Sequence, residues 1–178
     1  GLEMVEDNMY FATPKTMEWI EKLKQESKKN GTVGCVVLDK QGNLTAGTST
    51  GGMFKKRWGR IGDSPVIGAG TYADNNSCAV SCTGHGEYFI RHAVAFDVCA
   101  RYKYLKESVE KAADYIIHTE LNTNAGNGGL IAVDKLGNIA MPYNSGGMFR
   151  GFLYKEKGSP EIKKGCGIGK KIVVVGEK

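Results

Sequence analysis

The sequence lacks long apolar runs, has few histidines and contains an odd number of cysteines. No hydrophobic stretch approaches the length of a membrane-spanning helix, and the first residues show neither the basic region nor the apolar stretch of a signal peptide. Three histidines, two of them in helix-like stretches, argue against a zinc site. The five cysteines follow no disulfide or metal-ligand spacing. We therefore expect a reducing compartment and interpret Cys35 and Cys99 as small core residues.

The remaining composition is that of one globular domain. A chain of 178 residues can bury a sizeable core, and its 41% hydrophobic and 24% charged residues are ordinary proportions. We expect a cytoplasmic protein that does not bind membranes. The chain does not begin with Met, so its true N-terminus is not visible, and a periplasmic or secreted location stays open.

Positive charge is concentrated near the end of the chain, and the net charge is +5. A basic cluster with interleaved aromatic residues can bind nucleic acid. Here two glutamates interrupt the cluster, and only Phe152 and Tyr154 are interleaved with it. We therefore interpret it as a solvated tail and predict no nucleic-acid binding. Its basic residues are Arg150, Lys155, Lys157, Lys163, Lys164, Lys170 and Lys171.

Two strand hairpins related by an internal repeat dominate the predicted fold. The first has strands at residues 33–39 and 44–50, joined by a tight turn. Its sequence GCVVLDKQGNL, from residue 34, matches GLIAVDKLGNI, from residue 129, at a constant offset of 95 residues. The match continues with the sequence GGMF in both copies. The repeat predicts a pseudo-symmetric pair of sheets within one domain.

Two helices are predicted between the hairpins. The first opens near residue 84 and runs to about residue 104, and the second runs from about residue 106 to residue 121. A last short strand is predicted at residues 172–175. This order of elements predicts an α/β fold in which helices cover the sheets. The apolar positions are Phe89, Ala93, Phe96, Cys99 and Ala100 in the first helix, and Val109, Ala112, Ala113, Ile116 and Ile117 in the second.

A further helix is expected to precede the first hairpin and to end before Thr32. Thr13 and Pro14 suit its N-cap and first position, and the apolar residues Trp19, Ile20 and Leu23 follow at helical spacing. If the Gly31–Thr32 bond is cut, the new α-amino group of Thr32, with a pKa of roughly 7.7–8.0, can act as base for its own hydroxyl. Alternatively, Gly31 caps the helix and Thr32 simply begins a strand.

Other candidate site residues lie between residues 48 and 87. Arg60 and Asp63 are three residues apart in a glycine-broken loop, where a guanidinium could hold a carboxylate and a carboxylate could hold an ammonium. Together they would recognise the zwitterionic end of an amino acid, although a structural salt bridge between them explains the pair equally well. The sequence SCTGHGE at 81–87 places backbone N–H groups at a helix start, where they can stabilise an oxyanion. We interpret its His85 as solvent-facing.

Five motifs together resemble the isoaspartyl peptidase/L-asparaginase family, the plant-type asparaginases among the N-terminal-nucleophile hydrolases. The resemblance implies a four-layer αββα sandwich, of which this chain would be an incomplete part, and a precursor that cuts itself before its nucleophilic threonine. Residues 1–31 would be the tail of the α-subunit and residues 32–178 the β-subunit. The motifs are GTVGCV at 31–36, TSTGG at 48–52, GRIGDSP at 59–65, GAGTYAD at 68–74 and CTGHGE at 82–87.

The same resemblance implies a role for each candidate residue. Cleavage would fall between Gly31 and Thr32, and Thr32 would attack the side-chain amide or isopeptide carbonyl of asparagine or a β-aspartyl dipeptide. Thr50 would activate Thr32, and water would then release aspartate from the ester. The remaining roles are the substrate α-carboxylate for Arg60, its α-amino group for Asp63, the oxyanion for Thr83 and the Gly84 N–H, and a backbone contact to substrate for Gly86.

The resemblance also implies partners that this sequence does not contain. The family's chain is roughly twice as long, and its α-subunit begins with strands that are absent here. We expect tight association with that segment and a dimer of αβ units, a heterotetramer. No cofactor is implied for the chemistry and no metal ligand is predicted in these residues. A sodium-binding loop would lie in the α segment, and a structural sodium or potassium ion is compatible with it.

Two other functions stay open at this point. A glycosylasparaginase belongs to the same superfamily, but those enzymes usually have Thr-Asn-Gly where this chain has Thr50-Gly51-Gly52. A non-catalytic domain that binds nucleic acid or an acidic partner through its basic tail would leave the Gly31–Thr32 bond uncut.

Overall fold

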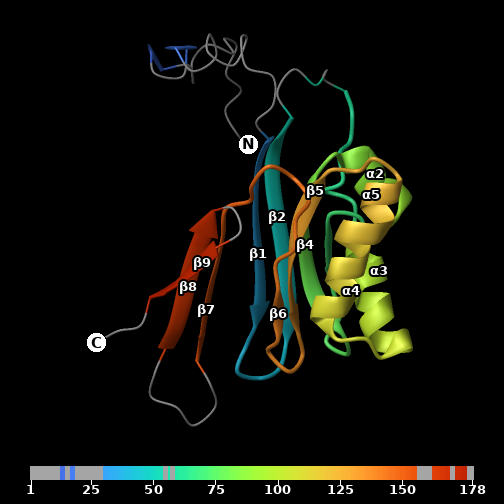
Figure 1. Ribbon diagram of the computed structural model, residues 1–178, viewed down its shortest axis with the longest axis vertical. Coiled ribbons are helices and arrows are strands. Elements are labelled where there is room, and N and C mark those ends of the chain that lie inside the picture. The colour runs from blue at the N-terminus through green and yellow to red at the C-terminus, as the bar shows by residue number, and fades with distance from the viewer. Residues whose placement is uncertain are drawn as a thin grey trace, which may run out of the picture.

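The computed structural model describes residues 13–14, 17–18, 30–53, 56, 59–155, 162–168 and 171–175. At its centre is a four-stranded antiparallel sheet, with a strand hairpin on one face and helices on the other (Figure 1). The expected α/β class is confirmed. The described residues supply three layers, so the fourth layer of the αββα sandwich stays a prediction. In spatial order the strands of the sheet are β3 (Thr71–Ala73), β4 (Cys78–Gly84), β5 (Gly128–Asp134) and β6 (Ile139–Ala140).

The hairpin on the open face consists of β1 (Asn30–Leu38) and β2 (Leu44–Met53). It packs on the sheet through a cluster of buried Leu44, Ala79 and Val133 and of partly buried Val36, Leu38, Ala46 and Ile139. Gly34 allows the close approach, because a Cβ at that position would overlap the side chain of Ser81 in β4. The hairpin and the sheet are therefore held in one relative position.

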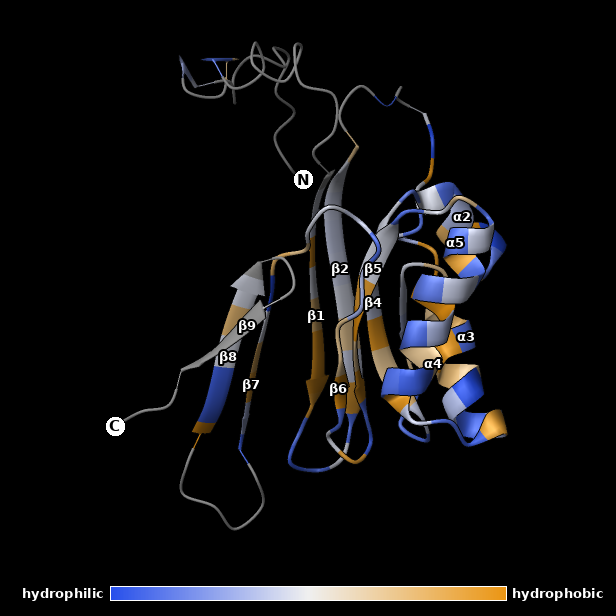
Figure 2. Cartoon of the chain, in the orientation of Figure 1, coloured by the Kyte–Doolittle hydropathy of each residue, from blue (hydrophilic) through white to orange (hydrophobic). Residues whose placement is uncertain are grey.

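The larger core lies between the sheet and the helices. Figure 2 shows hydrophobic residues on β4, on β5 and on the helix faces turned toward them. The apolar stripe predicted for the second helix is confirmed, since all five of its residues have 0% exposure. The helical elements are α2 (Gly86–Arg91), α3 (Val94–Ala100), the π-helical turn η2 (Arg101–Leu105), α4 (Val109–Tyr115), the π-helical turn η3 (Ile116–Glu120) and α5 (Leu121–Thr123).

The prediction of one continuous helix from residue 84 to about residue 104 is wrong. The chain breaks at Ala93, which has a left-handed backbone with φ of 44°, and the helical path restarts at Val94. Two backbone N–H groups at the start of α3 donate to the carbonyls of Ala69 and Gly68, at 3.1 and 2.8 Å. These tertiary hydrogen bonds reorient α3, which leaves Phe96 44% exposed instead of in the core.

The repeated turn is built identically in both hairpins. In the first, the Asp39 carboxylate accepts from the backbone N–H of Gln41 and from the backbone and side chain of Asn43, each at 2.8 Å. In the second, the Asp134 carboxylate accepts from the equivalent groups of Leu136 and Asn138, at 2.8 to 2.9 Å. The sequence repeat therefore encodes the same Asx turn twice. The copies differ in burial, because Asp134 is only 1% exposed while Asp39 is exposed.

The cysteine predictions need two corrections. Cys78 in β4 and Cys99 in α3 form a disulfide, although their spacing matched no known pattern. Packing of α3 onto β4 brings these distant residues together, which linear spacing does not reveal. Cys99 is buried as expected, whereas Cys35 is exposed on the outer side of the hairpin instead of lying in the core.

The basic end of the chain is not a simple solvated tail. It folds into a separate three-stranded antiparallel sheet of β7 (Arg150–Lys155), β8 (Ile162–Ile168) and β9 (Lys171–Val175), and β9 contains the predicted last strand. Near the other end, the Met17 N–H donates to the Thr13 carbonyl at 2.9 Å, as in a helical turn. Trp19, Ile20 and Leu23 lie outside the described residues. Among the described helices, none is long and apolar enough to cross a membrane.

The matched turns generate a stability prediction. Asp134→Ala should lower the free energy of unfolding by about 3 kcal/mol, because the carboxylate that it removes is 1% exposed and accepts three partly buried hydrogen bonds. Asp39→Ala removes the same three hydrogen bonds at an exposed turn, where water can replace them, and should cost about 1 kcal/mol. Urea unfolding of the two variants measures both values. Equal losses would show that burial does not set the cost of this turn.

Candidate active site

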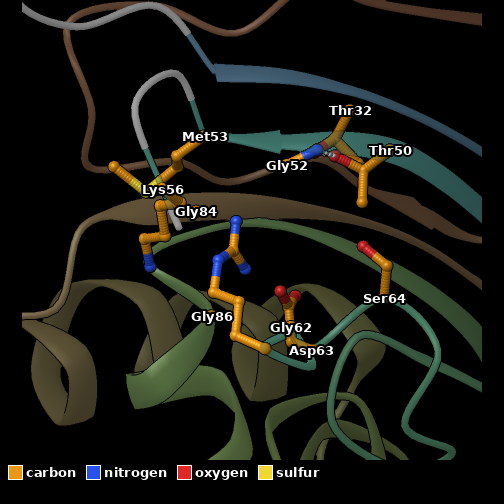
Figure 3. A pocket seen from close by; sticks show the side chains of 11 residues that line it. Thr32, Thr50, Gly52, Met53, Lys56, Gly62, Asp63, Ser64, Gly84 and Gly86 are labelled. Carbon is orange, nitrogen blue, oxygen red and sulfur yellow. Dashed lines mark hydrogen bonds between the residues drawn. The ribbon is translucent and has the colours of Figure 1, made fainter. Parts of the chain in front are cut away.

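A pocket lies where the ends of β2 and β4 meet the loop that follows β2. About 340 Å³ of free space lies within it, including space open to solvent. In Figure 3, Thr32 and Thr50 lie on one side of it and Asp63 and Ser64 on the opposite side. Six residues predicted from the sequence converge here: Thr32, Thr50, Arg60, Asp63, Gly84 and Gly86. The other lining residues are Gly52, Met53, Lys56, Gly62 and Ser64.

A chain of hydroxyl groups joins Thr32 to the carbonyl of Gly31. The pairing of β1 with β2 shifts by one residue between Gly31 and Thr32, so Thr32 lies opposite Thr50 while Gly31 lies opposite Gly52. The Thr32 hydroxyl donates to Thr50 Oγ1 at 3.2 Å, and the Thr50 hydroxyl donates to the Gly31 carbonyl oxygen at 2.9 Å. The Gly52 N–H donates to Thr50 Oγ1 at 2.9 Å and fixes its orientation. The bulge therefore aligns two hydroxyls with one peptide bond.

Asp63 is a buried carboxylate at the pocket wall. It is 7% exposed, and its Oδ2 has no hydrogen-bond partner among the residues that the structure describes. Two glycines make room for it: a Cβ on Gly86 would lie 2.7 Å from Asp63 Oδ1, and a Cβ on Gly70 would lie 2.8 Å from Oδ2. A buried carboxylate oxygen without a partner is costly, so its presence at a pocket wall indicates a site for a cationic ligand.

Burial raises the pKa of Asp63 above its ordinary value of 3.8. Its own backbone N–H and that of Ser64 act in the opposite direction, as does the positive charge of Lys56. A bound cation would act in the same direction as Lys56, because a nearby positive charge favours the ionised carboxyl.

Arg60 is exposed and lines the same pocket. Its guanidinium lies against β2, because a Cβ on Gly52 would be 2.6 Å from Nη2. The structural alternative predicted from the sequence, a salt bridge to Asp63, is not formed among the described residues. The two side chains instead present a guanidinium and a separate carboxylate to one cavity.

The segment proposed for the oxyanion lies only partly in the pocket. Gly84 ends β4 with φ of 153°, and a Cβ there would lie 2.6 Å from Phe89 Cε2, so no side chain fits. Gly84 and Gly86 line the pocket, whereas Thr83 and His85 do not. The His85 N–H donates to the Asn127 carbonyl at 2.9 Å, and the side chain is half-buried instead of freely exposed.

Sequence reasoning missed Lys56. This residue lines the pocket, and its ammonium pairs with the Glu87 carboxylate at 3.1 Å. It lies between the TSTGG and GRIGDSP motifs in a charged stretch that resembles an ordinary surface loop, so no periodicity or spacing marked it.

Comparison with known proteins identifies the family. A family model described as asparaginase matches residues 4–162, which is most of the chain. The chain belongs to this asparaginase family. It is 54% identical over 129 residues to an isoaspartyl peptidase of Salmonella typhimurium, covering 72% of this chain and 41% of the relative. It is 49% identical over 143 residues to an isoaspartyl peptidase of Escherichia coli, covering 75% of this chain and 44% of that protein.

A mammalian relative shows the same partial coverage. The chain is 44% identical over 148 residues to an isoaspartyl peptidase/L-asparaginase of Mus musculus, covering 76% of this chain and 44% of the mouse protein. The chain thus spans less than half the length of these three relatives.

The buried charge of Asp63 generates a pH prediction. Because its folded-state pKa is raised, the ionised carboxylate lowers stability at pH values above that pKa, and this penalty is absent where the group is protonated in both states. The difference in free energy of unfolding between Asp63→Asn and the unsubstituted protein should therefore shift in favour of the variant as the pH rises from about 3. It should become constant once Asp63 is ionised in both the folded and the unfolded state. Urea unfolding across this range measures the difference. A difference independent of pH would show that burial does not disfavour the charge.

Proposed function

We propose that the protein containing this chain is an N-terminal-threonine amidohydrolase that cleaves β-aspartyl dipeptides and L-asparagine. The observation that carries this proposal is the hydroxyl chain from Thr32 through Thr50 to the Gly31 carbonyl, across the pocket from Asp63. The names of the relatives, isoaspartyl peptidase and L-asparaginase, support the reaction class.

Self-cleavage would come first. The Thr32 hydroxyl attacks the Gly31 carbonyl carbon, its proton passes toward Thr50, and the Thr50 hydroxyl stabilises the charge on the carbonyl oxygen it already contacts. The Gly31–Thr32 C–N bond then breaks, the Thr32 nitrogen takes the proton and leaves as an amine, and the acyl group of Gly31 becomes an ester on Thr32 Oγ1. Water hydrolyses that ester, which frees the carboxylate of Gly31 and the hydroxyl of Thr32. Residues 1–31 and residues 32–178 then form two chains, and Thr32 gains a free α-amino group.

Substrate hydrolysis would use the same atoms. The free amine of Thr32 takes the proton from its own hydroxyl, which attacks the side-chain carbonyl of the substrate. Asp63 holds the substrate α-ammonium and Arg60 holds the α-carboxylate. The Gly84 N–H would stabilise the oxyanion together with Thr83, and Gly86 would contact the substrate through its backbone. The C–N bond of the substrate then breaks, the Thr32 ammonium returns its proton to the leaving nitrogen, and ammonia or an amino acid departs. Water releases aspartate from the ester.

The outer face of the hairpin supports the proposal of a further segment. Val33 is 69% exposed, Val37 is 46% exposed, and Cys35 lies exposed between them. Alternate residues of a strand share a face, so these three form one uncovered apolar strip. We propose that an α segment covers this strip and that αβ units form dimers.

The sodium-binding loop implied by the resemblance would belong to the same α segment. The described residues contain no group of three or more His, Cys, Asp or Glu side chains that could hold a metal ion. No step proposed above uses a metal.

The substrate assay compares three compounds: a β-aspartyl dipeptide, L-asparagine and a glycan-linked asparagine. We expect aspartate from the first two. Release of aspartate from the glycan-linked compound alone would indicate a glycosylasparaginase instead.

Thr32→Ala should abolish both self-cleavage and hydrolysis. The variant lacks the attacking oxygen, so we expect kcat to fall by at least about 10⁴-fold. Gel electrophoresis detects cleavage, and aspartate release measures turnover. The control Thr119→Ala changes an exposed threonine of η3, outside the pocket, and should leave both intact. A cleaved or active Thr32→Ala protein would overturn the assignment of the nucleophile.

Arg60→Lys should weaken substrate capture while sparing self-cleavage. A lysine ammonium cannot form the two parallel hydrogen bonds of a guanidinium with a carboxylate, so we expect KM to rise about tenfold with little change in kcat. Steady-state kinetics with a β-aspartyl dipeptide separate the two constants. An unchanged KM would mean that Arg60 does not bind the substrate carboxylate.

A further inference from the structure

The pocket is lined by a lysine whose ammonium resembles the substrate group that we assign to Asp63. Lys56 lines the cavity together with Asp63. Its ammonium has the chemistry of an amino acid's α-ammonium and sits on a flexible four-carbon chain. Since Asp63 Oδ2 has no partner among the described residues, Lys56 could fill the site proposed for the substrate. In Figure 3, the Lys56 side chain instead ends away from Asp63.

The Lys56 ammonium forms an ion pair with Glu87. Glu87 Oε2 lies 3.1 Å from Lys56 Nζ, with the two side chains 50% and 27% exposed. The backbone N–H of Glu87, and then Lys56, hold the pKa of this carboxyl below its ordinary value despite the opposing effect of burial. Glu87 is therefore a charged acceptor in the first turn of α2.

The position of Glu87 relative to Asp63 is set by the backbone. Glu87 directly follows Gly86, and a Cβ on Gly86 would be 2.7 Å from Asp63 Oδ1. The carboxylates of Asp63 and Glu87 therefore lie near the same stretch of chain, and Lys56 and Asp63 line the same pocket. The Lys56 ammonium is bound by Glu87, which is more exposed than Asp63.

We propose that Glu87 is a positioning residue that holds the Lys56 ammonium away from Asp63 and so keeps the ammonium site open for substrate. This inference rests on the proposed function, since it assigns the substrate α-ammonium to Asp63. It adds a specificity role for two residues outside the predicted site. Without Glu87, Lys56 would pair with Asp63 and act as an internal competitive inhibitor.

The expected size of the effect follows from the exposure of the pair. Exposed ion pairs change an equilibrium constant by a factor of about two to five. Glu87→Gln keeps the shape of the side chain and removes its charge. We expect it to weaken ligands that carry an α-ammonium by about threefold, and to leave kcat close to its original value.

The experiment uses the complete protein and combines Glu87→Gln, Lys56→Met and the double variant. The probes are L-aspartate and succinate, which differ by the α-amino group, with binding measured by calorimetry at about pH 8, where carboxylates are ionised. KM and kcat for a β-aspartyl dipeptide are measured in parallel. We expect Glu87→Gln to weaken aspartate and not succinate, and to lose this effect in the Lys56→Met background.

Two controls and three outcomes decide the inference. Lys111→Met removes an exposed lysine from a salt bridge of the same 3.1 Å length on α4 and should not change aspartate binding. Thermal unfolding checks that all variants are folded.

Equal weakening of aspartate binding by Glu87→Gln in both Lys56 backgrounds would show that Glu87 attracts the ligand directly, and would overturn the inference. Unchanged aspartate binding by Glu87→Gln, in a protein that hydrolyses β-aspartyl dipeptides, would also overturn it. A complete protein that neither hydrolyses these compounds nor binds aspartate would overturn the proposed function, and this inference with it.

Discussion

The close packing of the β1–β2 hairpin on β4 is the constraint on which the pocket depends. Gly34 meets Ser81 with no room for a Cβ, and the small cluster around Leu44 closes the other end of the interface. This contact fixes the distance between β1 and the sheet. Thr32, two residues before Gly34, is consequently held beside the end of β4, where the chain turns into α2. A looser interface would separate the hydroxyl side of the pocket from its charged side.

Burial of Asp63 illustrates how stability and ligand binding oppose each other at this site. A carboxylate with 7% exposure and one oxygen without a partner among the described residues is an unfavourable element of the empty fold. The same features favour a bound ammonium, because its charge is poorly screened there. Gly70 and Gly86 maintain this arrangement by leaving space on both sides of the carboxylate. Gly86, which packs against Asp63, directly precedes Glu87, so α2 begins beside the carboxylate.

Much of the fold could be predicted because its signals are local. The repeated Asp-Asn turn, the strand sequences and the buried stripe around Ile116 each depend on residues close together in the chain. The break at Ala93 and the Cys78–Cys99 disulfide could not be predicted in this way. Both depend on contacts between α3 and segments of the sheet layer that are distant in sequence.

In the candidate site too, residues in local motifs could be predicted and residues brought in by tertiary contacts could not. Thr32, Thr50, Arg60, Asp63, Gly84 and Gly86 lie in recognisable motifs, and the structure gathers them in one cavity. Thr83, predicted with them, is not among the lining residues. Lys56 joins the cavity through the tertiary fold, where its ammonium pairs with Glu87. Motifs thus identify groups that could perform chemistry, while the charges that control access to them emerge only in three dimensions.

The most direct test of the account is to trap the covalent intermediate. The complete protein is mixed with a β-aspartyl dipeptide, quenched in acid within one turnover, digested and analysed by mass spectrometry. The account predicts a peptide that begins at Thr32 and carries one aspartyl group as an ester on that residue. An aspartyl group on another residue, or turnover by a protein whose Gly31–Thr32 bond is intact, would contradict it.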